Sequence, residues 1–240
     1  MKSLLKDKKT EDISRLFDDI SRQYDFLNHF LSFGVDKLWR KKMIKMILRE
    51  GATDILDVAT GTADLAIYSS RYIPGSHITG IDISEKMLEV GREKILRLNM
   101  GKKINLVNSP AEKLPFGDNS FDAAMVAFGV RNFENLITGL EEMLRVIKPG
   151  NKFFILEFSK PRGLFGMIFR FYFKFILPLL GRLVSRNKDA YGYLHDSVMD
   201  FPQGEDFFKI METSGSIYNI QKRLSGGIAT IYIGQKRKKL

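Results

Sequence analysis

Short apolar runs rich in β-branched and aromatic residues alternate with helical stretches from residue 54 onward, and no other feature limits the fold as strongly. Runs with the length and composition of strands occur at 54–59, 77–82, 104–108, 121–128 and 152–158. Helices are expected near 64–73, 84–98 and 133–147, the last ended by the proline and glycine of KPG. This alternation predicts a parallel sheet with helices on both faces.

The C-terminal part follows a different pattern. SIYNIQKRL and GGIATIYIG, at 216–224 and 226–234, are separated by a short Ser/Gly turn, which predicts an antiparallel hairpin. We therefore expect a Rossmann-like α/β fold whose mostly parallel sheet ends in an antiparallel hairpin. With 240 residues and no Pro-rich or Gly/Ser-rich linker, a single domain over 1–240 is the simplest organisation.

Two additions to this sheet are expected. Helices beginning at Thr10 and Asp36 would form an N-terminal helical cap over about 10–50. The apolar segment LFGMIFRFYFKFILPLLGRLV, at 164–184, lies in an insert at about 160–200 that would form a lid. Arg170 and Lys174 make it a poor membrane span, because each costs about 2.5 to 3.5 kcal/mol at the bilayer centre. Their spacing puts both cations on one helix face, which suits a helix lying on an anionic surface or a buried helix of the lid.

Composition narrows the classes of site. The chain has no cysteine, which excludes disulfide scaffolds, Cys-ligated zinc and cysteine nucleophiles, and its three scattered histidines argue against a metal site. The N-terminal residues MKSLLKDKKTEDIS lack the apolar core of a secretory signal, so a cytoplasmic location is expected. The net charge of +10 suits an anionic partner, either nucleic acid or a phospholipid surface.

Acidic or small residues follow successive strands at the positions where a doubly wound sheet binds ligands. Asp57 precedes the small-residue loop 59–63, where Gly61 allows a ligand to approach the backbone closely. Asp82 ends the second strand, where a carboxylate can accept hydrogen bonds from two ribose hydroxyls. Ala111, in the loop at 109–122, is placed to touch a base edge. Each feature alone is explained by a helix cap or an ordinary turn, but together they favour a nucleoside ligand.

The residues of the first turn narrow the choice of nucleoside. ATGTADLA has one glycine where the dinucleotide motif G-x-G-x-x-G has three, and the phosphate-binding motif G-x-x-x-x-G-K-[ST] is absent from the chain. S-adenosylmethionine has no pyrophosphate, and its sulfonium and amino groups are cationic, so an acidic strand end attracts it. The turn therefore favours methyl transfer.

Stretches along nearly the whole chain resemble the signatures of the menaquinone/ubiquinone biosynthesis C-methyltransferases. In order they are YDFLNHFLSFGVDKLWRKK, ILDVATGTADLA, GIDISEKMLEVGREK, LPFGDNSFDAAMVAFGVRN, EMLRVIKPG, ILEFSKP and LSGGIATIYIG, from about residue 24 to 234. The resemblance implies a seven-stranded class I S-adenosylmethionine-dependent methyltransferase that methylates a ring carbon of a prenylated quinol. It implies cofactor contacts at Thr62, Asp82, Pro110 and Ala111, with Ala127 near the donor.

This sequence departs from the family pattern at two positions. Ala63 stands where the family usually has glycine, so a methyl group is added where close backbone approach is expected. Pro110 stands where Asp or Asn is commoner, and it lacks the backbone N–H that could contact adenine.

The chemistry that the resemblance implies needs no covalent enzyme nucleophile, because an electron-rich quinol carbon attacks the methyl group directly. The protein must align the reactants and supply a base or relay. The candidates are Arg131 and Asn132 of FGVRN, with Tyr24 and His29 on the N-terminal segment. The structural alternatives are an Arg131–Glu134 ion pair and a packed, hydrogen-bonded His29.

The substrate is expected to be demethylmenaquinol, converted to menaquinol, because the chain is short and lacks an N-terminal extension. The alternative within the same chemistry is a benzoquinol of the ubiquinone pathway. From other classes, an RNA methyltransferase or a non-catalytic membrane adaptor are alternatives, although the N/D-P-P-Y/F motif of amino-group methylation is absent. Expected partners are the prenylated quinol and an anionic membrane surface, with peripheral contact at the inner face of the membrane. No nucleic-acid partner is expected, and a homodimer is left open.

Overall fold

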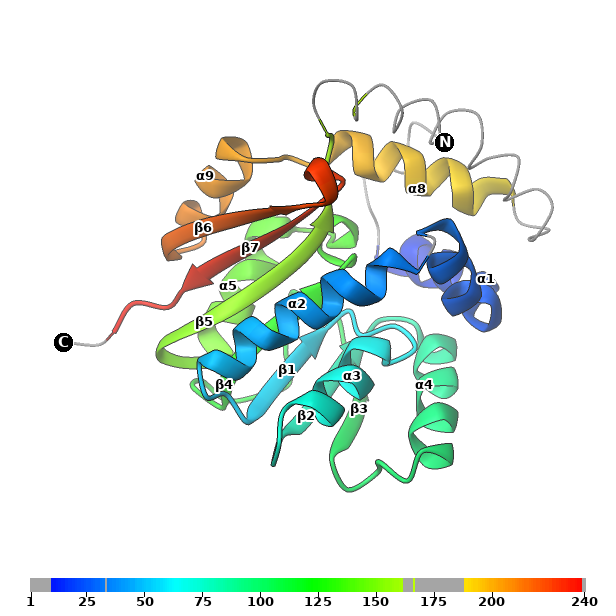
Figure 1. Cartoon of the computed structure of the whole chain (residues 1–240), viewed down its shortest axis with the longest axis horizontal. Coiled ribbons are helices and arrows are strands. Elements are labelled where there is room, and N and C mark those ends of the chain that lie inside the picture. The colour runs from blue at the N-terminus through cyan, green and yellow to red at the C-terminus, as the bar shows by residue number, and fades with distance from the viewer. Residues whose placement is uncertain (1–9, 33, 162–165, 167–187, 239–240) are drawn as a thin grey trace.

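The computed structural model describes residues 10–32, 34–161, 166 and 188–238, and in 22–31, 188–191 and 194–195 it describes the backbone alone. The apolar segment 164–184 lies almost entirely outside the described residues. Three layers make up the fold, with a central sheet between two layers of helices (Figure 1).

The sheet has seven strands in the order β3-β2-β1-β4-β5-β7-β6. The strands are β1 (Asp54–Val58), β2 (His77–Asp82), β3 (Ile104–Asn108), β4 (Phe121–Ala127), β5 (Ile147–Phe158), β6 (Ile217–Leu224) and β7 (Ala229–Gln235). Neighbours from β3 to β5 pair in parallel, whereas β7 is antiparallel to both β5 and β6. The predicted parallel sheet with a C-terminal antiparallel hairpin is therefore confirmed.

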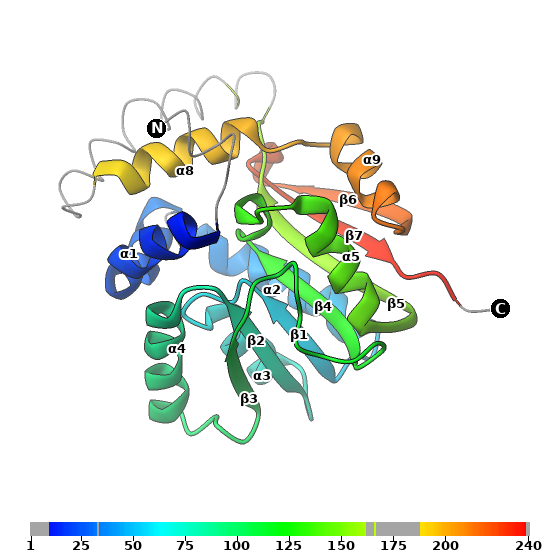
Figure 2. The ribbon, with the colours of Figure 1, turned by 180° about the vertical axis from the view of Figure 1, so that it is seen from behind.

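Helices α2 (Val35–Arg49), α3 (Asp64–Tyr72) and α4 (Glu85–Arg97) cover one face of the sheet. Their apolar stripes pack on alternate strand residues, as when Met43 and Ile47 of α2 join a cluster with Ile55 and Met125. Helices α5 (Leu136–Val146) and α9 (Glu205–Thr213) cover the opposite face, which Figure 2 shows from behind. The long loop between β3 and β4 is clamped to α5, because Arg145 donates to the carbonyls of Leu114 and Phe116.

Two elements differ from the boundaries expected from sequence. The helix before KPG ends at Val146, but the chain then enters β5 directly, so the proline and glycine lie inside a strand rather than before it. The extension is held by the segment after β7, since Gly150 donates its backbone N–H to Lys236 and Lys236 donates to Asn151. Helix α9 was not anticipated, although Phe207 and Met211 on one face bury completely against the sheet.

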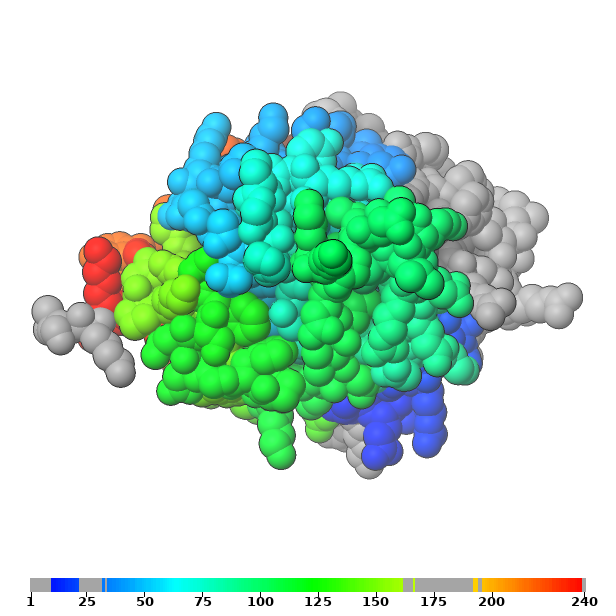
Figure 3. Space-filling view, turned by 90° about the horizontal axis from the view of Figure 1, so that it is seen from below, coloured from blue at the N-terminus to red at the C-terminus, as the bar shows by residue number. Residues whose placement is uncertain are grey.

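Helix α1 (Thr10–Leu31) and helix α8 (Lys188–Asp200) lie together at the end of the sheet toward which β1 and β4 run (Figure 1). Within the region expected as an N-terminal cap, only α1 lies over the strand ends, because α2 packs on the sheet face. Figure 3 shows α1 and the C-terminal residues toward opposite ends of the molecule. The sheet order reverses between β1 and β4, and in open α/β sheets ligands bind at such a switch point.

Candidate cofactor and active site

A cavity lies beyond the carboxyl ends of β1 to β4, beneath α1, with a volume of about 50 Å³. Its lining comes from four parts of the chain: α1, the ends of β1 and β2, the start of the loop after β3, and the turn after β4. The lining residues are Thr10, Ile13, Phe17, Ala59, Ile81, Asp82, Ile83, Ser109, Ala111, Glu112, Gly129, Asn132, Phe133 and Glu134. Small-molecule sites enclose roughly 300 to 1,000 Å³, so this cavity is smaller than a typical ligand site in this conformation.

Asp82 lies at the end of β2 and lines this cavity. Its Oδ1 accepts the backbone N–H of Ser84 at 2.9 Å, and its Oδ2 accepts that of Gly61 at 2.8 Å. Burial raises the pKa of Asp82 to about 6 despite these bonds. A carboxylate has about four acceptor positions, so Asp82 ties the first two ligand loops together and retains capacity for ribose hydroxyls.

Asp57 is buried at the end of β1 on the side of the sheet that α2 and α3 cover. Its Oδ2 accepts the Thr60 hydroxyl at 2.6 Å, whereas its Oδ1 accepts no hydrogen bond of normal geometry. Burial raises the pKa of Asp57 to about 7, opposed by the Thr60 bond and the positive charge of Arg40. This half-satisfied carboxyl group fits a cationic ligand better than it fits an empty protein.

The loop between β1 and α3 turns through left-handed backbone at Ala59 and Ala63, with φ of 52° and 65°. The methyl group at position 63 is fully buried, and it faces Gly91 of α4, where an added Cβ would lie 3.3 Å from it. Ala63 therefore adopts the backbone conformation that explains a family preference for glycine. Thr62 is also buried and accepts a hydrogen bond from Lys94 at 3.1 Å.

The third strand end contributes Ala111 to the cavity lining, as expected. Pro110 is not among the lining residues, and its carbonyl accepts from the Ser109 hydroxyl at 3.2 Å. Ala127, the last residue of β4, packs against the core cluster and likewise does not line the cavity. The structure thus brings Asp82 and Ala111 to one cavity, with Asp57 and Thr62 in the adjoining turn.

Arg131 lies in η1 (Val130–Asn132), the single helical turn after β4. It is buried against Glu157, with Nη1 to Oε1 at 2.9 Å, and it also donates to the Phe128 carbonyl and to Ser197 of α8. Arg131 therefore forms a buried ion pair with Glu157. Glu157 is fully buried, its Oε2 accepts no hydrogen bond from the described residues, and burial raises its pKa.

Asn132 lines the cavity and its Oδ1 accepts the Tyr193 hydroxyl at 2.9 Å. Tyr193 lies on α8, one helical turn before Ser197, and burial raises its pKa to about 12. The two α8 side chains thus hold adjacent residues of η1. The side chains of Tyr24 and His29 are outside the described residues, although both positions lie on α1.

Sequence reasoning missed Glu157, Tyr193, Ser197 and Arg40. Glu157 lies within the motif ILEFSKP, where it is an acidic residue among apolar strand residues. An acidic residue among strand residues that are otherwise apolar indicates a buried partner. No comparable signal marks Tyr193 or Ser197, because their contacts join residues more than 60 positions apart.

The chain is similar to known proteins over nearly its whole length. The model of the ubiE/COQ5 methyltransferase family matches residues 3–236. A ubiquinone/menaquinone biosynthesis C-methyltransferase of Geobacter sulfurreducens is 45% identical over 95% of this chain and 90% of its own length. A demethylmenaquinone methyltransferase of Bacteroides fragilis is 42% identical over 95% of this chain and 94% of its own.

Solved structures share the fold at low sequence identity. A SAM-dependent methyltransferase from Aquifex aeolicus superposes with a TM-score of 0.56 at 20% identity, covering 76% of this chain and 81% of that one. The [4+2]-cyclase SpnF superposes with a TM-score of 0.66 at 16% identity, covering 96% of this chain and 98% of that one. Because a cyclase shares the architecture, the fold alone does not specify the reaction.

Proposed function

The chain belongs to the ubiE/COQ5 methyltransferase family, and from this we propose that it methylates a ring carbon of a prenylated quinol with S-adenosylmethionine as methyl donor. The observation that carries the proposal is the position of the family residues in space. Asp82 at the end of β2, Ala111 after β3 and Asn132 after β4 line one cavity at the switch point of the sheet.

The residues present fit S-adenosylmethionine. An acidic side chain with spare acceptor capacity lies where the ribose would bind, and the half-satisfied carboxyl group of Asp57 lies where a cationic group would bind. The bound donor would supply an electrophilic methyl group. The chain's own residues would hold the donor at Asp57, Gly61, Thr62, Asp82 and Ala111, and exclude water beneath α1.

The quinol oxygen needs a group that removes or polarises its proton as the ring carbon attacks. Asn132 faces the cavity and is the residue of FGVRN best placed to contact substrate. Arg131 is held by Glu157, Ser197 and the Phe128 carbonyl, so it acts by fixing the turn that presents Asn132. Tyr24 and His29 remain proposed contributors from α1.

We favour demethylmenaquinol over a benzoquinol as the substrate. The relatives named as demethylmenaquinone methyltransferases include those of Bacteroides fragilis and Staphylococcus aureus, at 42% and 40% identity. The Geobacter relatives carry names that cover both pathways. A benzoquinol of the ubiquinone pathway therefore stays as the second candidate.

A prenylated quinol resides in a lipid bilayer, so the enzyme is proposed to work as a peripheral protein at the inner, cytoplasmic face of the membrane. In the described part of the chain, no helix is long and apolar enough to cross a bilayer. The net charge of +10 supports contact with anionic lipid. A homodimer is compatible with this arrangement but is not required by it.

Three parallel incubations test the proposal. The purified protein is mixed with methyl-labelled S-adenosylmethionine and, in separate vessels, reduced demethylmenaquinone, the corresponding reduced demethylated benzoquinone, or RNA. Mass spectrometry is expected to find one label on the naphthoquinol ring and little on the other two. Label on the benzoquinol alone would reassign the substrate, and label on RNA alone or on nothing would overturn quinol methylation.

A further inference from the structure

Arg40 of α2 is a buried cation whose Nε makes no hydrogen bond to the described residues. Its exposed fraction is 7%. Its Nε lies 3.5 Å from Oδ2 of Asp36 on the same helix. A guanidinium has five N–H donors, and a buried one is normally paired with an anion in a bidentate arrangement.

Arg40 lies above the carboxyl ends of β1 and β4. Its Cζ is 5.4 Å from the ring centroid of Phe128, which directly follows β4. Asp57 of β1 is in register with Met125 of β4, three residues before Phe128. Asp57 has an unsatisfied acceptor, because its buried Oδ1 accepts no hydrogen bond of normal geometry. A buried cation and a buried anion, each incompletely satisfied, therefore flank the turn that begins the cofactor site.

Among the described residues, the other cations near this turn are already engaged. Arg131 is held by Glu157, Ser197 and the Phe128 carbonyl. Lys94 donates to Asp64 at 2.5 Å and to Thr62 at 3.1 Å. An anionic group that enters beside Asp57 would therefore find its counter-ion in Arg40.

We propose that Arg40 and Asp57 together form the binding site for the amino-acid head group of the methyl donor, Arg40 holding its carboxylate and Asp57 its ammonium. This inference rests on the proposed use of S-adenosylmethionine. An α-amino acid is zwitterionic. Its carboxylate can therefore pair with the buried guanidinium while its ammonium group pairs with the buried carboxylate. Asp36, one turn before Arg40, helps to hold the guanidinium through the ion pair at its Nε.

The test is the affinity of the empty protein for product analogues, measured by calorimetry. The ligands are S-adenosylhomocysteine and its decarboxylated analogue, which lacks only the carboxylate. The variants are Arg40→Met, which keeps an apolar stem, Arg40→Lys, and the control Lys41→Met, an exposed neighbour over the Tyr72 ring. Arg40→Met is expected to weaken the binding of S-adenosylhomocysteine about 10- to 100-fold, and that of the decarboxylated analogue less than about threefold. Arg40→Lys should lie between, and Lys41→Met should change neither.

Equal weakening of both ligands by Arg40→Met, or no weakening of either, would overturn the assignment. If Arg40→Met does not fold, Arg40→Lys and the wild-type protein still decide, because an intact carboxylate site must discriminate between the two ligands. Asp57→Asn with the deaminated analogue tests the other half by the same logic. A protein that binds S-adenosylhomocysteine through Arg40 but labels no quinol would contradict the proposed reaction and leave this site standing.

Discussion

Buried carboxyl groups define the cofactor site at the scale of single residues. Burial raises the pKa of Asp57 to about 7 and that of Asp82 to about 6, so the empty folded protein holds protons that the unfolded chain releases near the ordinary pKa of 3.8. A group of this kind makes the folded state progressively less stable as pH rises from about 4 through its folded pKa. The ionised carboxylates that would bind the ligand therefore lower the stability of the folded protein when no ligand is bound.

Asp57→Asn is expected to stabilise the ligand-free protein at pH 8 and to weaken the binding of the methyl donor. The gain in free energy of unfolding should grow between pH 4 and pH 7 and reach at most about 4 kcal/mol above that range. Urea denaturation at pH 5 and pH 8 measures it. Asp122 is the control of opposite sign, because bonds from Lys148 and the 53–54 backbone hold its pKa at about 2 against partial burial. Asp122→Asn should lower stability at both pH values, and a gain there would contradict this electrostatic account.

The Arg131–Glu157 pair predicts a strong dependence of each partner on the other. Arg131→Met leaves a fully buried Glu157 without its counter-charge, which is expected to cost about 3 to 5 kcal/mol of unfolding free energy. Glu157→Gln in the same protein should restore more than half of the loss, measured by chemical denaturation. If the double variant is no more stable than Arg131→Met, the charge pair is not the source of the cost.

Sequence patterns predicted the elements best where local pattern and burial coincide. The strands 54–58 and 77–82 read as β-rich runs, and the sheet buries most of their residues, with turn residues beyond each run. The strand 104–108, where only Ile104 is buried, was predictable from its composition alone. KPG was misassigned because the strand around it is stabilised by pairing with residues near 236, which no local pattern encodes. Asp82 and Ala111 were predictable because they lie at strand ends. The contacts of Arg131 with Glu157 and Ser197 were not, because these residues are 26 and 66 positions away in the sequence.

Helix α8 is expected to affect turnover rather than cofactor binding. Tyr193→Phe removes the hydroxyl that orients Asn132 and keeps the ring in its buried position. A lost hydrogen bond of about 0.5 to 1.5 kcal/mol predicts a kcat lower by about 2- to 12-fold. Affinity for S-adenosylhomocysteine should be unchanged. A variant with normal kcat and weakened cofactor affinity would remove α8 from the organisation of the catalytic turn.

Helix α1 is held over the cavity by contacts at both ends of its described part. Thr10 donates its backbone N–H to Glu134 at 3.0 Å, and the Ser84 hydroxyl donates to Asp18 at 2.5 Å. Because Thr10, Ile13 and Phe17 of α1 line the cavity, a bound donor is expected to hold this helix in place. Hydrogen exchange of residues 10–21 is expected to be slowed by saturating S-adenosylhomocysteine more than exchange of α9. Equal protection of both helices would show a global effect of the ligand instead of a local effect on α1.

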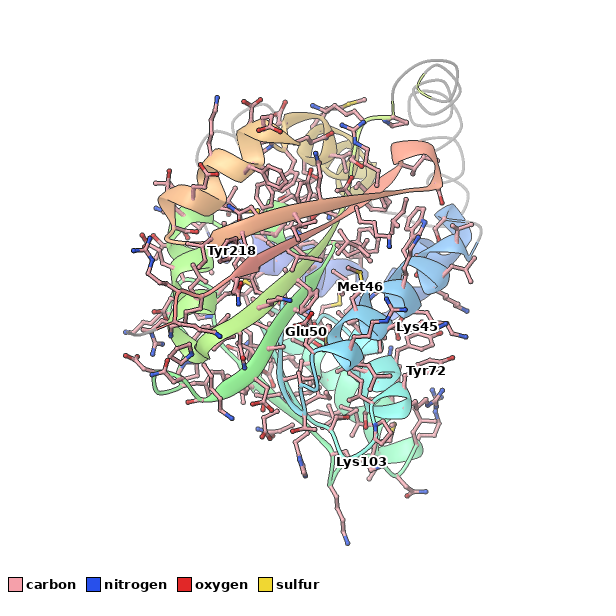
Figure 4. The ribbon with its side chains drawn as sticks, turned by 60° about the vertical axis from the view of Figure 1, so that its left-hand side comes forward. Lys45, Met46, Glu50, Tyr72, Lys103 and Tyr218 are labelled. Atoms are coloured by element: carbon pink, nitrogen blue, oxygen red, sulfur yellow. The ribbon has the colours of Figure 1, made fainter. Side chains whose placement is uncertain are left out.

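The whole molecule carries its positive charge unevenly. Along the outer side of α2, Lys37, Lys41, Lys42, Lys45 and Arg49 are exposed together with Leu38, whose exposed fraction is 65%. Figure 4 shows Lys45 on α2 and Tyr72 on α3 at the surface of this layer. A helix with cations and apolar side chains on its solvent side suits the surface of an anionic bilayer. We therefore expect binding to phosphatidylglycerol-containing vesicles at low salt that weakens at high salt.

The contribution of α2 to vesicle binding can be separated experimentally from the contribution of the net charge. Lys37→Glu, Lys41→Glu and Lys45→Glu together should abolish co-sedimentation with anionic vesicles at low salt. The charge-matched control Lys209→Glu, Lys222→Glu and Arg223→Glu alters exposed residues on α9 and β6, and it should retain most binding. Equal losses in the two variants would mean that only the overall charge matters, since local attraction falls off within a Debye length of about 10 Å at 0.1 M salt. Retained binding in both would assign membrane contact to another part of the chain.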